Sequence, residues 1–383
     1  MRIFVTGTRG IPDIPGGIER HCEALYPRIV RRSHEVILAT RPPYVLRRSS
    51  RWKGVWLVPC YCPRRRHLEA IVHTALALVR ARRFRPDLVH IHGIGPALTV
   101  PLARMAGYRV VVTHHGPDYD RQKWGRVAKA ALRAGEWLGC RYAHAVIAIS
   151  EPIREIVRRR CGRTAHRIPN GVRSPDRRET TDYLERIGVT PGDYVLAVAR
   201  FVPEKGLHDL ITAFRGMDRP VKLVIAGDAD HPDDYSRRLR RMAGGDPRIV
   251  LTGYITGDPL AEVYSHAGLF VLPSYHEGLP IALLEAMSYG RSVLVSDIPA
   301  NREVGLPADR YFRAGDPEDL RVRMEKRLDI GWTTAQGRQL RLKTGRTYNW
   351  DRIAEATAEV YRDVLAEQRG LRICDFQNPK SKI

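Results

Sequence analysis

The feature that most constrains the fold is a regular alternation of short apolar runs and longer amphipathic segments in the first half of the chain. Strand-like runs lie at residues 2–6, 35–39, 55–59, 87–91, 109–113 and 145–149, and helix-like segments at 19–32, 68–83, 96–106, 123–140 and 151–160. Strands separated by helices of this length favour a doubly wound parallel sheet. Ser150 precedes the last helix, and we expect its hydroxyl to cap that helix.

The alternation restarts after a polar, charged stretch at residues 173–182. Strand-like runs follow at 194–200, 221–226, 249–252, 269–272 and 292–296, with helical segments between them. Residues 350–368 then form one long amphipathic segment with apolar residues at near 3.6 spacing. The sequence therefore predicts two α/β units in tandem, joined by a linker that ends near residue 180, and a final helix.

Two carboxylates eight residues apart organise the second unit. Pro280 is tolerated in the first turn of a helix but not deeper, so we expect a helix from there to Gly290. Glu277 then lies on the preceding loop and Glu285 inside the helix. A strand, a glycine-containing loop and a helix N-terminus form a natural phosphate pocket. Because the two acids can accept hydrogen bonds from hydroxyls, the stretch predicts a nucleotide sugar as ligand.

Two other loops follow strands and could reach the same ligand. Residues 7–19 do not match the dinucleotide fingerprint, but Gly16 and Gly17 at a helix start let backbone amides approach an anion. Arg200 ends a strand of the second unit, and Lys205 lies on the loop that follows. Both cations can stabilise a departing nucleoside diphosphate without a metal. The alternatives are a flexible turn and two surface charges.

His114 and His115 follow another strand and so also lie at a sheet edge. Such a pair could act as general acid or base, bind a metal or be structural. We expect one of the two to reach the sugar. Only Asp118 stands at ligand spacing, and Cys60 and Cys62 are too close for the usual zinc pair, so we expect no metal cofactor.

The net charge of +22 lies in the first half. Residues 1–180 hold 35 Lys and Arg against 13 Asp and Glu, whereas residues 181–383 hold 29 of each. A basic half could face nucleic acid, an anionic membrane or an anionic substrate, or could be an ordinary solvated surface. Arginines flank the apolar helix after residue 68, which suits an anionic membrane surface as well as it suits a sheet-covering helix. These arginines are Arg47, Arg48, Arg51, Arg64, Arg65, Arg66, Arg80, Arg82, Arg83 and Arg85.

No run reaches the roughly 18 apolar residues of a membrane span, and the chain begins directly with a strand. We therefore expect a cytoplasmic protein, and the basic half suggests a peripheral place on the inner face of the cell membrane.

The motifs together resemble the retaining glycosyltransferases of the GT-B family 4. The resemblance is carried by the stretch at 273–290, by the segment at 200–206, by the linker turn at 169–172 and by the terminal Trp350 helix. It implies an α/β, GT-B fold of two Rossmann-like doubly wound domains facing each other across a cleft. Residues 1–180 would bind the acceptor, residues 181–349 would bind the nucleotide sugar, and the helix at 350–370 would pack back on the first domain.

The resemblance also implies a role for each matched residue. Glu285 would bind the ribose hydroxyls, and Glu277 the hydroxyls of the donor sugar, near the backbone of Gly278 and Leu279. His115 would contact the sugar near the reaction centre, so that Glu277 and His115 form the catalytic pair. The diphosphate would be held by four residues, namely Arg200, Lys205, Gly16 and Gly17.

The motifs at residues 7–19 and 115–125 resemble a bacterial subgroup that includes polysaccharide rhamnosyltransferases. We therefore expect transfer of a hexose or deoxyhexose, rhamnose being one candidate, to a glycan or lipid-linked acceptor. A nucleotide-sugar epimerase of the same fold is one alternative, and the pair of acids counts against it. A nucleic-acid-binding protein is the other alternative, but the charge lies in no known recognition motif, so we expect no nucleic-acid partner.

Overall fold

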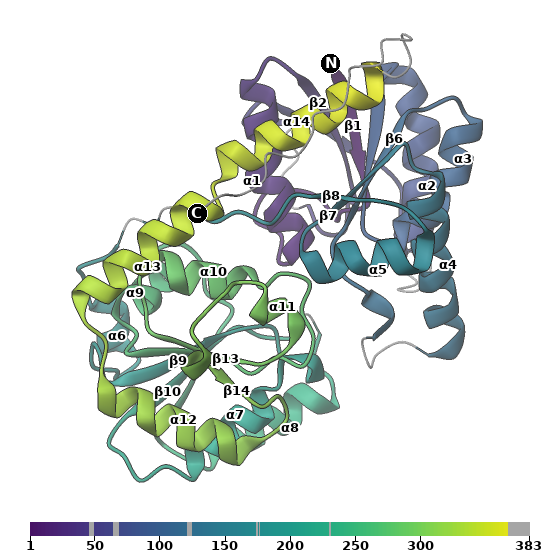
Figure 1. Cartoon of the computed structure of the whole chain (residues 1–383). Coiled ribbons are helices and arrows are strands. Elements are labelled where there is room, and N and C mark those ends of the chain that lie inside the picture. Colours follow the sequence, from purple (N-terminus) through teal and green to yellow (C-terminus); the bar gives the residue numbers. More distant parts are fainter. Residues whose placement is uncertain are drawn as a thin grey trace.

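The computed structural model of the chain is built on two β-sheets, one in each half of the sequence (Figure 1). It describes residues 1–45, 50–63, 69–120, 125–173, 175, 177–229 and 231–366. The last strand of the first sheet ends at Arg167, and the first strand of the second sheet begins at Tyr194. The expected linker at 173–182 therefore lies between the sheets, while the exact domain boundary stays a prediction.

The first sheet has eight strands in the order β3-β4-β2-β1-β5-β6-β7-β8. All neighbours are parallel except β3 and β4. The strands are β1 Arg2–Thr6, β2 Glu35–Thr40, β3 Arg51–Trp52, β4 Val55–Pro59, β5 Leu88–His92, β6 Val110–His114, β7 Ala145–Ala148 and β8 His166–Arg167. The central strands are apolar throughout because helices cover both faces of a parallel sheet.

The two faces of this sheet are covered by different helices. Inward-facing Ile3 and Val5 of β1 share a core with Leu25 of the helix that follows, whereas Phe4 packs with Leu78 on the opposite face. The helices are α1 Gly17–Arg31, α2 Glu69–Ala81, α3 Val100–Met105, α4 Arg126–Tyr142 and α5 Glu151–Cys161, with 3-10 turns η1 Arg82–Phe84, η2 Pro96–Thr99 and η3 Asp118–Asp120.

The second sheet has six parallel strands in the order β11-β10-β9-β12-β13-β14. The strands are β9 Tyr194–Val198, β10 Lys222–Ala226, β11 Ile249–Gly253, β12 Leu269–Leu272, β13 Val293–Ser296 and β14 Tyr311–Phe312. The helices are α6 Asp182–Arg186, α7 Leu207–Arg215, α8 Asp234–Gly244, α9 Gly257–His266, α10 Ile281–Ser288, α11 Pro299–Arg302, α12 Pro317–Ile330 and α13 Thr334–Thr347, with 3-10 turns η4 Pro203–Lys205 and η5 Ala308–Arg310.

Each sheet has a point at which the strand order reverses. β1 lies between β2 and β5, and β9 lies between β10 and β12. In open α/β sheets, ligands bind outside the carboxyl ends of the strands at such a point. The glycine-rich loop follows β1 and the segment with Arg200 follows β9, so both loops lie where a ligand is expected.

The last helix, α14 (Trp350–Ala366), crosses from the second unit and runs along α1 on the first sheet (Figure 1). Its buried residues, among them Ile353 and Tyr361, belong to the same core as the apolar face of α1. The Arg32–Glu355 ion pair, 2.8 Å long, joins the two helices at the surface. Exposed pairs of this kind contribute little, so the apolar contact holds α14 in place. Residues 367–370 of the predicted helix lie outside the described residues.

The observed elements follow the sequence pattern with few exceptions. Each predicted strand is present, shifted at an end by two residues at most, whereas the two-residue strands β3, β8 and β14 carry no readable alternation. The predicted helix at 96–106 begins as a 3-10 turn. Ser150 is the N-cap residue of α5, as predicted, but among the described residues its hydroxyl has no hydrogen-bond partner, so the expected side-chain cap is wrong. Pro152 lacks the amide that such a cap would bind, and the Glu303 carboxylate accepts from the Glu151 amide at 3.1 Å instead.

The described helices include none that is long and apolar enough to cross a membrane. Five of the six cysteines lie in the described part of the chain, and all five are free and buried. Cys60 and Cys62 take part in no cluster with metal-binding geometry there.

Candidate active site

The loop between β12 and α10 places Glu277 at the carboxyl edge of the second sheet. Pro280 is the N-cap residue of α10, so the helix begins where the proline predicts. The Glu277 carboxylate accepts hydrogen bonds from Lys205 Nζ and, at 2.7 Å, from Ser274 Oγ. The side chains of Lys205 and Glu277 are 19% and 10% exposed. Because β9 and β12 are neighbours, the predicted cation and acid meet at one point.

Glu285 lies within α10, as predicted, and faces a cavity of about 430 Å³ between the two units. Its carboxylate accepts from the Tyr264 hydroxyl at 3.1 Å and from Arg20 Nη1 at 2.8 Å. The cavity wall also includes Tyr254 of the second unit and Trp350 of α14. An acid at the wall of a cavity of this size can bind the hydroxyls of a ligand.

Arg20 is a site residue that the sequence reasoning missed. It lies in the first turn of α1 and crosses to Glu285 in the opposite unit. Proximity to Glu285 raises the pKa of the Arg20 guanidinium, against the opposite effect of burial. The signal available was that Arg20 follows Gly17 of the predicted phosphate loop by three residues, but a sequence does not show which face of a helix lies toward the opposite unit.

The glycine-rich loop ends at the N-terminus of α1. Gly16 has a φ of 144°, which favours glycine, and a Cβ built there would lie 2.0 Å from the Glu19 carboxylate. That carboxylate folds back on the loop and accepts from the Arg9 amide at 3.0 Å. A Cβ at Gly17 would meet nothing within 4 Å. The backbone at Gly17 is therefore open to an approaching group, as the prediction requires.

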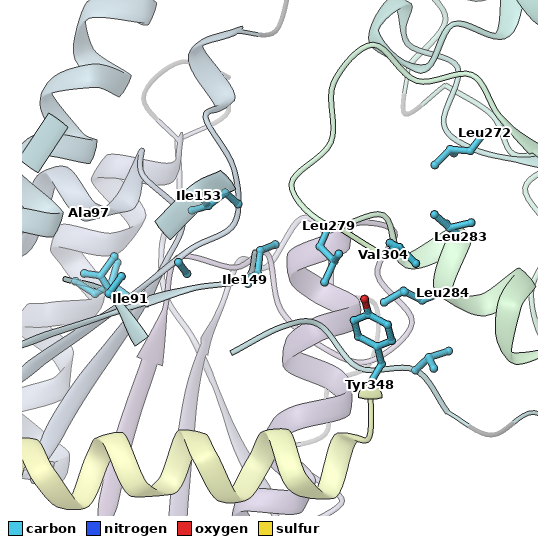
Figure 2. Packing of buried hydrophobic residues seen from close by; sticks show 14 of the residues in the cluster. Ile91, Ala97, Ile149, Ile153, Leu272, Leu279, Leu283, Leu284, Val304 and Tyr348 are labelled. Carbon is cyan, nitrogen blue, oxygen red and sulfur yellow. The ribbon is translucent and has the colours of Figure 1, made fainter. Parts of the chain in front are cut away.

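Gly278 and Leu279 lie where the two units touch. A Cβ on Gly278 would lie 2.1 Å from the carbonyl oxygen of His115, so only glycine fits there. Leu279 is buried, and Figure 2 shows its side chain pointing toward Ile149 of the first unit, near Tyr348. Asn170 Nδ2 donates to the Leu279 carbonyl at 3.3 Å. The loop between β12 and α10, called the donor loop below, is thus fixed against the first unit and the linker.

The structure separates the roles of the adjacent histidines. His114 is fully buried, and its Nε2 lies 2.9 Å from Glu136 Oε1. Its Nδ1 accepts the Gly116 amide at 3.1 Å. His114 is therefore structural, whereas His115 is partly exposed beside Gly278. The expected contact of His115 with the donor sugar, and its role in catalysis, stay predictions.

His115 belongs to a cluster that the sequence did not predict. Ligating atoms of His21, His92 and His115 lie within 4.8 Å of one another. His21 Nδ1 lies 2.9 Å from Asn170 Oδ1, and His92 Nδ1 lies 2.9 Å from His115 Nε2. Burial lowers the pKa of His21 to about 4 and lowers that of His92 and His115 well below the usual range. These rings are therefore neutral at pH 7.

Arg200 lies two residues beyond β9 and is partly exposed. It therefore lies at the same sheet edge as Lys205, as predicted.

A second polar cluster lies at the carboxyl end of β2 in the first unit. Arg41 and Glu69 form an ion pair with side chains only 7% and 12% exposed, and Tyr44 donates to the same carboxylate at 3.0 Å. Within the part of the chain that the structure describes, Arg41 Nε and both ring nitrogens of the fully buried His73 have no hydrogen-bond partner. Buried polar groups usually have partners, so this cluster can accept a further polar group.

Two family models match the two units. Residues 15–174 match the Glycosyltransferase Family 4 model, and residues 192–329 match the model of Glycosyl transferases group 1. An uncharacterized glycosyltransferase of Methanocaldococcus jannaschii is 25% identical over 391 residues, which cover 94% of this chain and 98% of that protein.

Two further proteins are similar. TuaC of Bacillus subtilis, a glycosyltransferase named for teichuronic acid biosynthesis, is 28% identical over 244 residues, which cover 62% of this chain and 58% of that protein. The crystal structure of Anabaena HepE in complex with UDP-glucose superposes with a TM-score of 0.77 and 18% identity, covering 94% of this chain and 99% of HepE. At that identity the likeness concerns the fold.

Proposed function

Because the chain is a family 4 glycosyltransferase with the GT-B fold, we propose that it transfers a hexose or deoxyhexose from a nucleotide-diphospho-sugar in bacterial surface polysaccharide synthesis. The observation that carries the proposal is the pairing of Lys205 with Glu277 on the loop before α10, the helix whose Glu285 faces the cavity. This loop and helix, together with Lys205, thus offer a cation for phosphate and two acids for hydroxyls. The UDP-glucose bound to HepE and the role named for TuaC support this reading.

In the proposed donor complex the ligand spans the cleft from Glu285 to Lys205. Glu285 takes the ribose hydroxyls, and Arg20, its present partner, contributes to the same wall. Lys205 and Arg200 hold the diphosphate, and the open backbone at Gly17, after Gly16, approaches it from the first unit. A group aligned in this way needs little reorganisation when charge develops on it.

The donor sugar then lies between Glu277, the backbone of Gly278 and Leu279, and His115. Transfer proceeds with retention by substitution on the front face of the sugar, and the departing diphosphate takes the proton of the acceptor hydroxyl. Lys205 stabilises that diphosphate by direct charge. The residues at hand supply this stabilisation themselves, so we propose that no metal cofactor is required.

The first unit is the proposed acceptor side. Its Arg41–Glu69 cluster lies at the carboxyl edge of the sheet, and its polar atoms that have no partner among the described residues would bind a glycan. The exposed side of α2 and α3 carries apolar side chains that suit a lipid-linked acceptor at an anionic membrane. This α2–α3 surface consists of Leu76, Val79, Leu102 and Met105, with the exposed Arg80, Arg82, Arg83 and Arg104. Arg47, Arg48 and the arginines at 64–66 lie outside the described residues.

A thermal-shift screen of UDP-, GDP- and dTDP-sugars tests the donor half of the proposal. We expect one nucleotide class to raise the Tm, because a ligand present at 100 times its Kd adds about 2.7 kcal/mol to stability. Transfer to a glycan acceptor is then measured with that donor. Conversion of the donor without any acceptor would indicate an epimerase and would contradict the proposal.

A further inference from the structure

The proposed site uses His115, yet three more histidines are buried next to it. His90 and His92 come from β5, and their rings stack with centroids 4.2 Å apart. The His115 ring lies 5.2 Å from that of His92, and His21 of α1 contacts it edge-on at 4.9 Å. Burial lowers the pKa of His90 to about 3. The rings are neutral at pH 7, so each has one N–H and one acceptor nitrogen.

We propose that Tyr26 and His92 are positioning residues which fix the ring tautomer of His115, so that His115 presents Nδ1–H to the donor sugar. The inference rests on the proposed function for what His115 faces. The tautomer itself does not depend on the proposed function, because it follows from the hydrogen bonds that link His115 to His92 and His92 to Tyr26.

A continuous chain of contacts reaches His115 from the core. His115 Nε2 lies 2.9 Å from His92 Nδ1. His92 Nε2 contacts the hydroxyl of Tyr26, which is also 3.0 Å from His90 Nδ1. His115 Nδ1 has no hydrogen-bond partner among the residues that the structure describes, and the side chain is partly exposed. The series of hydrogen bonds therefore ends at a ring nitrogen of a partly exposed side chain.

The residues at the buried end of this series of hydrogen bonds determine the direction in which its protons are donated. His90 Nδ1 lies 2.6 Å from the Tyr361 hydroxyl of α14, and His90 Nε2 lies 2.7 Å from Thr113 Oγ1. When Tyr361 donates to His90 Nδ1, the proton of Tyr26 is left for His92 Nε2. His92 then carries its own proton on Nδ1 and donates it to Nε2 of His115.

The reverse direction is less favourable. If the ring of His115 donated to His92, then His92 would donate to the Tyr26 oxygen. The hydroxyl protons of Tyr26 and Tyr361 would then compete for the single lone pair of His90 Nδ1. A buried hydroxyl without an acceptor costs free energy, so the contacts favour a proton on Nδ1 of His115.

A metal ion held by His21, His92 and His115 would be a different use of the same cluster. Tetrahedral zinc, with bonds of about 2.0–2.1 Å to nitrogen, separates its ligand atoms by roughly 3.3 Å. The 2.9 Å between His92 Nδ1 and His115 Nε2 is instead an ordinary hydrogen-bond distance. The geometry therefore favours a hydrogen bond between His92 and His115. The experiment must distinguish this hydrogen bond from a bound metal ion.

The tautomer can be measured without substrate. Histidine ¹⁵N labelling distinguishes protonated from bare ring nitrogens, and His115→Gln assigns the signal. We expect a proton on Nδ1 of His115 in the full chain. Tyr26→Phe removes the hydroxyl that points at His92 but keeps the ring, so we expect the proton to move to Nε2 or to become shared. Tyr361→Phe should produce a smaller shift, because it frees His90 to compete for the Tyr26 proton.

The matched control is Tyr194→Phe. Tyr194 is also fully buried, and its hydroxyl donates to the Val263 carbonyl in the second unit at 2.7 Å. We expect Tyr26→Phe to lower kcat/KM by about tenfold, as loss of an outer-shell partner typically does. We expect Tyr194→Phe to leave both the His115 tautomer and kcat/KM unchanged.

Two results would overturn the inference. One is an unchanged His115 tautomer in both Tyr26→Phe and Tyr361→Phe. The other is stoichiometric zinc in the purified chain that is lost in His21→Gln, which would assign the cluster to a metal. If no nucleotide sugar binds, the proposed function fails, but the tautomer measurement still decides whether the hydrogen-bonded chain exists.

Discussion

At the scale of single residues, the pairing of Lys205 with Glu277 links the proposed diphosphate side to the proposed sugar side. The two side chains lie on different loops but share a largely buried position. Because the Glu277 carboxylate already holds the lysine side chain, that side chain loses less rotamer freedom when it binds a phosphate. The pair therefore prepares the cation for a phosphate.

We predict that Lys205→Ala and Glu277→Ala each lower kcat by about 100- to 1,000-fold, the range found when a group that stabilises a developing charge is removed. Circular dichroism should show an unchanged fold. Lys343→Ala is the control, because Lys343 is exposed and its Nζ donates to the Gly305 carbonyl. Full activity of Lys205→Ala would contradict the diphosphate assignment.

Gly278 gives a second prediction at this scale. A methyl group there would collide with the His115 carbonyl, at 2.1 Å, and push the donor loop away from the first unit. Because a misplacement of about 1 Å can cost 100-fold in rate, we expect Gly278→Ala to lower kcat/KM by about that factor. Gly345→Ala should have no effect, since a Cβ there meets nothing within 4 Å. Equal activity of the two variants would mean that the loop contact is dispensable.

At the scale of elements, α14 does two things. It covers α1 on the first sheet, and through Trp350 it contributes to the cavity at Glu285. The backbone of Gly171 in the linker packs closely against this indole, and a Cβ at Gly171 would lie only 2.6 Å from the ring. The helix therefore connects the core of the first unit to the site wall.

We predict that Ile353→Ala, in the buried face of α14, lowers the free energy of unfolding of the first unit by about 2–5 kcal/mol. Arg352→Ala, on the exposed face next to it, should change it by about 0.5 kcal/mol or less. Urea unfolding followed by tryptophan fluorescence measures both. Similar midpoints for the two variants would show that α14 does not depend on its apolar face.

At the scale of the whole molecule, the proposed chemistry needs no metal. We predict that EDTA leaves the initial transfer rate unchanged, because Lys205 and Arg200 supply the positive charge at the diphosphate. The rate is measured before and after dialysis against chelator. Loss of activity that Mg²⁺ restores would refute this part of the proposal.

The α2–α3 surface gives a prediction at the same scale. We expect the protein to float with vesicles that contain anionic lipid and not with neutral ones, since each Lys or Arg near such a surface contributes about 1 kcal/mol. Val79→Asp should weaken flotation, because Val79 is 65% exposed on α2 and belongs to this surface. Val322→Asp is the matched control, since Val322 is 47% exposed but lies in the second unit. No dependence on lipid charge would remove the support for membrane docking.

The sequence by itself determined the sheet layout and the chemistry of the donor loop. Parallel strands buried on both faces are apolar throughout, and Pro280 fixes where α10 can begin, so these elements can be predicted locally. The positions of Glu277, Arg200 and Lys205 at a sheet edge, and of Glu285 inside α10, follow from the same local pattern.

The tertiary structure alone decided which groups meet across the cleft. Arg20 reaches Glu285 over 265 residues of sequence, and the Glu303 carboxylate replaces the Ser150 cap from the other unit. The adjacent histidines look alike in sequence, yet Glu136 holds one and His92 the other. Such contacts depend on how two helix faces and two sheets are placed relative to each other, and local residue patterns do not encode that placement.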